Sequence, residues 1–249
     1  MSLSRQFPTV AIDLRGWGQS SGPEPRHTAQ DYSIIPMASD VVSVLDHLRN
    51  NPKTNALFGN GIILIGHSMG AKVALATLRG ISDDRLALIK GIVLVAPAPP
   101  TPLVLPAEMS EQQRGAYSTE ESVQWTVQNV LSNTENLTDA DRSMVIRDSL
   151  AGNVLAKDGW ILHGMQEDIS SVLGEVASRP PHNGKAIKFI VLAGELDVVE
   201  QKDRVYSDVV QALTGQGFDV TFTVLDGVKH LFPLEKPDAV RQAISLVSC

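Results

Sequence analysis

The sequence predicts an α/β fold in which a mostly parallel β-sheet carries helices on both faces. Short apolar runs rich in β-branched residues alternate with stretches of helical spacing, which is typical of parallel strands buried on both sides. One of these runs leads through a glycine-flanked turn straight into a helix. The alternation stops over residues 99–180, where only helical patterns occur. We therefore expect a sheet domain with an inserted helical cap.

The predicted strands are five short apolar runs. They cover residues 9–13, 62–65, 92–95, 189–192 and 220–225. Apolar residues repeat at helical spacing between these runs, at Val41, Val44, Leu45 and Leu48 and again at Val205, Val209 and Leu213. Pro237 is a favourable first-turn residue, so a last helix is expected from there to the C-terminus.

The chain is divided into three parts by its proline-rich stretches. The segment APAPPTPLVLP opens the predicted cap and Pro180-Pro181 closes it. Residues 1–98 are then the first part of the core, residues 99–180 the cap, and residues 181–249 the second part of the core. Trp125 and Trp160 in the cap are explained most simply as its own core, with a substrate pocket as the alternative.

Composition and charge exclude several classes of function. The 249 residues are 43% hydrophobic and 20% charged, which are globular values. A net charge of −7 argues against binding to a phosphate backbone, so no nucleic-acid partner is expected. No apolar run approaches the roughly 20 residues needed to span a bilayer. Whether the chain forms a homodimer is left open by the sequence.

The single cysteine, Cys249, is the last residue. One thiol makes neither an internal disulfide nor a thiolate metal site, so a reducing compartment is the default and no metal is expected. The N-terminus lacks a signal-peptide layout because Asp13 interrupts its short apolar stretch. A cytoplasmic location is therefore expected.

The segment with the clearest chemical meaning is residues 61–75, which read GIILIGHSMGAKVAL. An apolar strand ends in a tight turn with Ser68 at its tip, and a helix follows at once. Such a turn holds a serine in a strained, exposed conformation at a helix N-terminus, where free N–H groups favour developing negative charge. Ser68 is predicted to be a nucleophile, and an ordinary turn serine is the alternative.

A serine nucleophile needs a base and an acid that orients the base. Asp197 and His230 each follow a predicted strand, and loops after parallel strands gather on one edge of the sheet. Ser68, Asp197 and His230 also occur in the chain order that such an elbow requires. Alone, Asp197 would be a turn former and His230 a loop histidine. Glu195 and Asp226 compete for the role of the acid.

Other aromatic residues are weaker site candidates. His67 belongs to the elbow and is a tentative pocket residue. Trp17 follows the DLRG segment and reaches either the mouth of the pocket or only the surface. The remaining histidines lack a matching context; they are His27, His47, His163 and His182.

Four motifs from Ala11 to Pro237 carry a family resemblance. They are AIDLRGWGQSSGP, GHSMGA, LAGELDVV and GVKHLFPLEKP, in that order. The chain resembles the α/β-hydrolase superfamily, in the branch of small capped serine esterases, enol-lactonases and cofactor-free haloperoxidase-like enzymes. The resemblance implies Ser68 as nucleophile, His230 as base, Asp197 as acid and the amide of Met69 as one oxyanion donor.

The activity that this resemblance implies is cleavage of a small carboxylic ester or lactone by water, through an acyl-enzyme and without a metal or organic cofactor. Some relatives use the same triad for acyl transfer, perhydrolysis or cyanohydrin cleavage, and these stay open. A serine in the elbow instead of an aspartate argues against the dehalogenase and epoxide-hydrolase variants.

The chain departs from the family pattern at its start. Family members usually carry three strands before the segment matching residues 9–13, and the third leads into a His-Gly loop that supplies the second oxyanion donor. Only seven residues precede Pro8, so the chain is expected to be N-terminally shortened; His163-Gly164 matches the loop by coincidence. Loss of one such donor costs about 10²–10³ in turnover. The alternative function is therefore a catalytically weak relative that binds a small apolar ligand or a partner.

Overall fold

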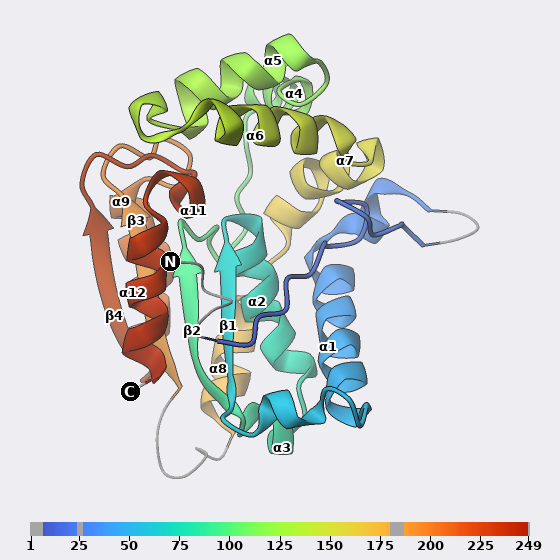
Figure 1. The fold of residues 1–249 in the computed structure, drawn as a ribbon, viewed down its shortest axis with the longest axis vertical. Helices are drawn as coiled ribbons and strands as arrows, with labels where there is room; N and C mark the ends of the chain where they lie inside the picture. Colours follow the sequence, from blue (N-terminus) through green and yellow to red (C-terminus); the bar gives the residue numbers. More distant parts are fainter. Residues whose placement is uncertain (1–6, 24–26, 180–186, 249) are drawn as a thin grey trace.

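The computed structural model describes residues 7–23, 27–179 and 187–248, and within them one parallel sheet forms the centre of the fold (Figure 1). Its strands are β1 (Ile62–His67), β2 (Ile89–Val95), β3 (Lys188–Gly194) and β4 (Asp219–Leu225), in the order β1-β2-β3-β4. Each neighbouring pair runs parallel. Four of the five predicted strands and the α/β class are confirmed.

Helices connect the strands and cover the sheet. They are α1 (Ile34–Asn50), α2 (Met69–Gly80), α3 (Asp83–Leu86), α4 (Ala107–Gly115), α5 (Glu120–Thr126), α6 (Asp139–Ala151), α7 (Val154–Leu162), α8 (Ser170–Ala177), α9 (Lys202–Val205), α10 (Gln211–Gly215), α11 (Phe232–Glu235) and α12 (Pro237–Ser248). Short π-helical turns extend α5 over Val127–Leu131 and join α9 to α10 over Tyr206–Val210. No helix in the described ranges is both long and apolar enough to cross a membrane.

The two faces of the sheet bury alternate residues of the central strands. Ile92 and Leu94 of β2 belong to the larger apolar cluster, which includes α1, α2 and α8. Val93 and Val95 belong to the second cluster, which includes α12. The alternation follows from the two-residue period of a strand. Figure 1 shows α12 on one side of β2 and β3 and α2 on the other.

The inserted helices, α4 to α7, lie between β2 and β3 in the sequence and above the carboxyl ends of the strands in space (Figure 1). The chain then returns to α8, which packs against α2 and buries Val172, Leu173 and Val176 in the core. The division into a core and a cap of residues 99–180 stays a prediction, and α8 packs with the sheet domain. Pro180-Pro181, His182 and Cys249 lie outside the described residues.

The predicted strand over residues 9–13 is wrong, because this segment pairs with no strand in the described part of the chain. An apolar extended run becomes a strand only where a neighbour offers backbone partners. The segment passes beside β1 across a cavity of about 1030 Å³ instead of joining its edge. Val10 is consequently half exposed, and β1 is an edge strand.

Candidate active site

Ser68 stands at the turn between β1 and α2, and its backbone there is strained. Its φ of 51° and ψ of −118° lie where residues with a side chain rarely occur. Two contacts hold this turn: the Ser68 amide donates to the Val95 carbonyl at 2.9 Å, and the Ala98 amide donates to the Ser68 carbonyl at 3.3 Å. The conformation predicted for the elbow is therefore present.

Gly66 makes the close approach of α2 to β1 possible. A Cβ atom at this position would lie 2.4 Å from the Gly70 carbonyl oxygen and 2.5 Å from the Ala71 Cα atom. Because Met69 is the first residue of α2, its N–H has no acceptor inside the helix. This amide is available to a negatively charged oxygen at the end of the helix.

Asp197 and His230 meet after β3 and β4. Asp197 Oδ2 lies 2.8 Å from His230 Nδ1, and both side chains are buried. The other carboxylate oxygen of Asp197 accepts the amides of Val199 at 2.8 Å and Glu200 at 3.0 Å. These amides fix the carboxylate, which in turn orients the imidazole.

The two competing acids are bonded elsewhere, Glu195 through its carboxylate and Asp226 through its backbone carbonyl. Glu195 accepts the Gly227 amide at 3.0 Å, which ties the acid loop to the histidine loop. The carbonyl of Asp226 accepts from Lys236 Nζ at 3.4 Å. Among the described side chains, the carboxylate that bonds to His230 is that of Asp197.

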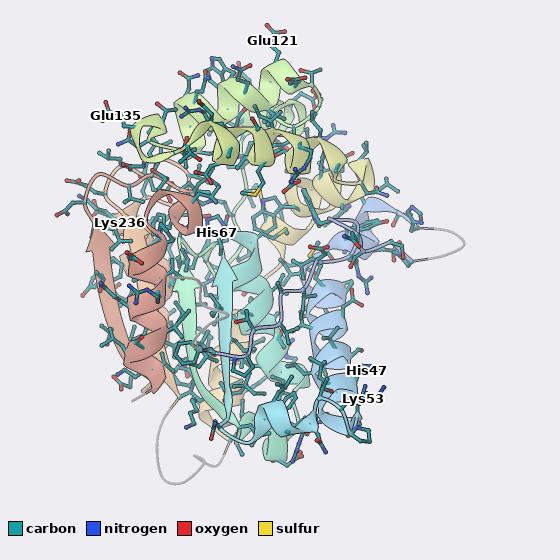
Figure 2. The ribbon with its side chains drawn as sticks, in the orientation of Figure 1. His47, Lys53, His67, Glu121, Glu135 and Lys236 are labelled. Atoms are coloured by element: carbon teal, nitrogen blue, oxygen red, sulfur yellow. The ribbon has the colours of Figure 1, made fainter. Side chains whose placement is uncertain are left out.

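His67, the last residue of β1, reaches across to the histidine loop. Its Nε2 donates to the His230 carbonyl at 2.8 Å, and the two rings lie 4.9 Å apart between centroids. Burial, together with the neighbouring His230, lowers the pKa of His67 to about 3, so His67 is neutral around pH 7. Figure 2 places His67 at the upper end of the sheet, below the inserted helices, with His47 at the far end of the molecule.

Glu235 supports the histidine loop from the other side. Its buried carboxylate accepts the amides of Asn133, Lys229 and Leu231 at 2.9, 3.2 and 3.1 Å. The amides of His230 and Leu231 both donate to the Leu131 carbonyl, at 2.9 and 3.0 Å. The loop that carries His230 is therefore fixed by the insertion as well as by the sheet.

The serine hydroxyl is the least constrained part of the site. Ser68 makes no side-chain capping bond to α2. Within the described residues, no hydrogen bond joins its hydroxyl to the His230 imidazole, although the neighbouring residue His67 contacts that ring. Catalytic hydrogen bonds are often long in the absence of substrate and tighten when it binds.

A sequence model of the alpha/beta hydrolase family matches residues 2–243. The chain belongs to this family. Comparison with curated protein sequences gives no match. Many solved structures match, and three of them, each with 15% sequence identity, are an esterase, a bromoperoxidase and an enol-lactonase. At this identity the matches establish the fold alone.

The first of the three is an esterase from Exiguobacterium antarcticum, with a TM-score of 0.67 over 95% of this chain and 80% of that chain. A bromoperoxidase from Bacillus anthracis gives a TM-score of 0.71 over 94% of this chain and 79% of that chain. The enol-lactonase from Burkholderia xenovorans LB400 gives a TM-score of 0.68 over 94% of this chain and 78% of that chain. This α/β hydrolase therefore shares its fold with enzymes of different names.

The three tryptophans proposed for the pocket have different surroundings. Trp17 packs on Gly152, where a Cβ atom would lie 2.7 Å from the indole ring. Trp160 is half buried against the main core cluster, and Trp125 is 54% exposed. Their role in a substrate pocket stays a prediction.

Sequence reasoning did not find the supporting residues of this α/β hydrolase. Glu235 and Glu200 are both buried carboxylates near His230 and Asp197. Burial raises the pKa of Glu200 to about 7, against the opposing effect of Arg204 at 2.7 Å. The signal available in the sequence was position alone, because Glu200 lies three residues after Asp197 and Glu235 five residues after His230.

Proposed function

We propose that this α/β hydrolase cleaves a small carboxylic ester or lactone with Ser68 as the nucleophile. The observation that carries the proposal is the buried 2.8 Å contact between His230 Nδ1 and Asp197 Oδ2, at the sheet edge where the strained Ser68 stands. An Nδ1–H that donates to the carboxylate leaves Nε2 as the basic nitrogen.

In the proposed reaction the Ser68 hydroxyl oxygen attacks the carbonyl carbon, and His230 Nε2 accepts the hydroxyl proton. The resulting oxyanion accepts a hydrogen bond from the Met69 amide. Collapse breaks the ester bond, and the leaving alkoxide takes the proton from Nε2. Water then attacks the acyl-enzyme by the same steps and releases the acid. Asp197 stays ionised throughout and stabilises the imidazolium.

The neighbours support an ester or lactone as the substrate class. Besides the esterase and the enol-lactonase, the matches include Est816, described as an N-acyl homoserine lactone degrading enzyme, with 19% identity and a TM-score of 0.65. The bromoperoxidase is the neighbour that would fit perhydrolysis instead. Short-chain esters are therefore the first substrates to test.

The test is hydrolysis of p-nitrophenyl acetate and butyrate by the wild type and Ser68→Ala. We expect the variant to lose at least about 10³ in kcat/KM, because the attacking group is gone. Ser39→Ala is the matched control, since Ser39 is an exposed residue of α1 whose hydroxyl donates to the Ile35 carbonyl of the same helix. Equal rates for Ser68→Ala and the wild type would overturn the proposal.

The second candidate function is binding of an apolar ligand by a catalytically weak relative. The observation that favours it is the cavity of about 1030 Å³ beside β1, whose walls include Val10, Ile12, Leu45 and Val73. Large, mainly apolar cavities are typical of ligand sites. A fluorophosphonate probe separates the two candidates. Labelling of Ser68 favours the hydrolase, and absence of labelling together with a rise in Tm on adding n-decanol favours binding.

A further inference from the structure

Lys72 is a fully buried cation in the helix that begins just after Ser68. It is 1% exposed and lies one turn into α2. A buried ammonium is unfavourable unless polar groups of the protein replace its water. The proposed reaction gives Lys72 no part, so its burial needs another explanation.

The partners of Lys72 are two backbone carbonyls far apart in the sequence. Its Nζ donates to the carbonyls of Thr101 and Met165, at 3.3 Å each. Thr101 lies where the chain leaves the sheet for the inserted helices, and Met165 lies where it returns. Figure 1 shows these two connections, from β2 to α4 and from α7 to α8.

The two connections are also bonded to each other. The Leu103 amide donates to the Met165 carbonyl at 2.8 Å, and the Ile169 amide donates to the Pro100 carbonyl at 2.9 Å. Two residues after Met165, the Glu167 carboxylate accepts the amide of Ile34, the first residue of α1. Lys72 thus lies at the point where both ends of the insertion are attached to the sheet domain.

The first of these connections is also bonded to the turn that carries Ser68. The Ala98 amide donates to the Ser68 carbonyl, two residues before Pro100. A shift of the connections relative to α2 would therefore move the inserted helices over Ser68.

We propose that Lys72 is a positioning residue that fixes the inserted helices over Ser68 by holding both of their connections with one ammonium group. Its kinetic consequences rest on the proposed hydrolase function, whereas its structural consequence does not. Removal of the ammonium should loosen the two connections and leave the sheet intact.

Protonation adds a condition to this role. Burial lowers the pKa of Lys72 to about 8, although Glu167, Asp168 and Glu200 act in the opposite direction. The ammonium that donates to both carbonyls is therefore present at pH 7 and is lost as the pH rises above about 8. The attachment of the insertion should weaken over the same range.

The decisive experiment measures amide hydrogen exchange of Leu103 and Ile169 in Lys72→Met. Methionine keeps most of the side-chain volume and removes the charge, and such replacements of buried charges are often neutral for folding. We expect exchange of these two amides to rise at least about tenfold, with the amides of β2 and β3 unchanged. Unchanged exchange of Leu103 and Ile169 would overturn the proposal.

Lys157→Met is the matched control. Lys157 also donates to a backbone carbonyl, that of Tyr117 at 2.9 Å, but both residues belong to the insertion. It should leave Leu103 and Ile169 unchanged, and an equal effect in both variants would also overturn the proposal. If Lys72→Met fails to fold, the wild type decides: the same amides, corrected for intrinsic exchange, should accelerate between pH 7 and 9.5, and no acceleration would refute the role of the ammonium.

The kinetic readout separates this proposal from the hydrolase proposal. With p-nitrophenyl butyrate, Lys72→Met should raise KM about tenfold and change kcat less, because a loose insertion binds substrate poorly but leaves the triad residues in place. A fall in kcat with unchanged KM would contradict the positioning role. If the wild type hydrolyses no ester, the exchange experiment still decides the role of Lys72.

Discussion

The sheet holds the candidate catalytic residues more firmly at its β3–β4 end than at its β1 end. At one end, β3 pairs with both β2 and β4, and its loop bonds to the next loop through Glu195 and the Leu196 amide. At the other end, β1 pairs with β2 alone among the described strands, and its outer edge borders a large cavity. The acid follows β3, which is paired on both sides, and the base follows β4, an edge strand whose loop is bonded to the acid loop; we call these two strands the paired end. The serine follows β1, the edge strand beside the cavity.

This difference explains why one half of the candidate triad is assembled and the other half is not. The Asp197 carboxylate accepts two backbone amides, and it in turn holds the His230 imidazole. Among the described residues, the Ser68 backbone bonds to Val95 of β2, to Ala98 just after β2, and to the first turn of α2. We therefore expect substitutions at the paired end to have large effects and substitutions that join the two ends to have smaller ones.

The largest effect is expected from Asp197→Asn. An asparagine keeps the shape but cannot hold the imidazole with Nδ1–H directed at a carboxylate, so kcat for ester hydrolysis should fall by about 10³–10⁴. Glu195→Gln is the control, because Glu195 lies in the same loop but accepts the Gly227 amide, whereas the His230 imidazole bonds to Asp197. A loss in Glu195→Gln as large as that in Asp197→Asn would contradict the assignment of the acid.

Gly194→Ala should destabilise the paired end itself. A Cβ atom there would lie 2.4 Å from the Lys229 carbonyl oxygen and 2.6 Å from that of Val228, so the histidine loop must move. Overpacking of this kind costs about 1–3 kcal/mol in the free energy of unfolding, which urea titration measures. Gly115→Ala is the control: it lies in a helix with nothing within 4 Å and should be neutral or slightly stabilising. Equal free energies of unfolding for Gly194→Ala and the wild type would refute the close packing of the histidine loop on Gly194.

The pH dependence of stability tests the buried carboxylate at the same end. Because burial raises the pKa of Glu200 from 4.5 to about 7, folding disfavours its charged form. Its contribution to stability is present below pH 4.5 and is lost as the pH rises through about 7. The wild type should therefore lose about 3 kcal/mol relative to Glu200→Gln between pH 4.5 and 8, measured by urea unfolding at each pH. A difference in stability between these two proteins that does not change with pH would contradict the raised pKa of Glu200.

The acid and histidine loops could be located from the sequence because each follows an apolar strand and the parallel order puts both at one edge. The choice of Asp197 over Glu195 could not be made in this way, since both lie in one loop and only the side-chain directions separate them. The supporting residues Glu235 and Lys72 were not predicted, because their contacts come from segments remote in the sequence.

The prediction that failed concerns residues 9–13. The apolar pattern there is that of a strand, but strand formation is a property of pairs, and the pairing partner is not encoded in the segment itself. The same limit applies to the insertion, where helical spacing predicted helices and did not reveal that α8 packs with the sheet domain.

The smallest expected effect comes from the contact that joins the two ends. In His67→Phe the ring contact with His230 is kept and the hydrogen bond to its carbonyl is lost. This loss should raise the activation free energy by about 1 kcal/mol, and kcat should therefore fall about fivefold. Phe58→Leu is the control for kcat, since Phe58 is a buried residue in a 3₁₀ turn after α1. An unchanged kcat in His67→Phe would mean that Ser68 and His230 are aligned without this contact.

The same variant makes a separate prediction about acid stability. Because the pKa of His67 is lowered from 6.5 to about 3, its contribution is present above pH 6.5 and is lost as the pH falls through about 3. As the pH falls from 6.5 to about 3 the wild type should lose stability relative to His67→Phe, whereas relative to Glu200→Gln it should lose stability as the pH rises from 4.5 to about 7. If the two variants showed the same pH dependence, the edge strand and the paired end would not be electrostatically distinct.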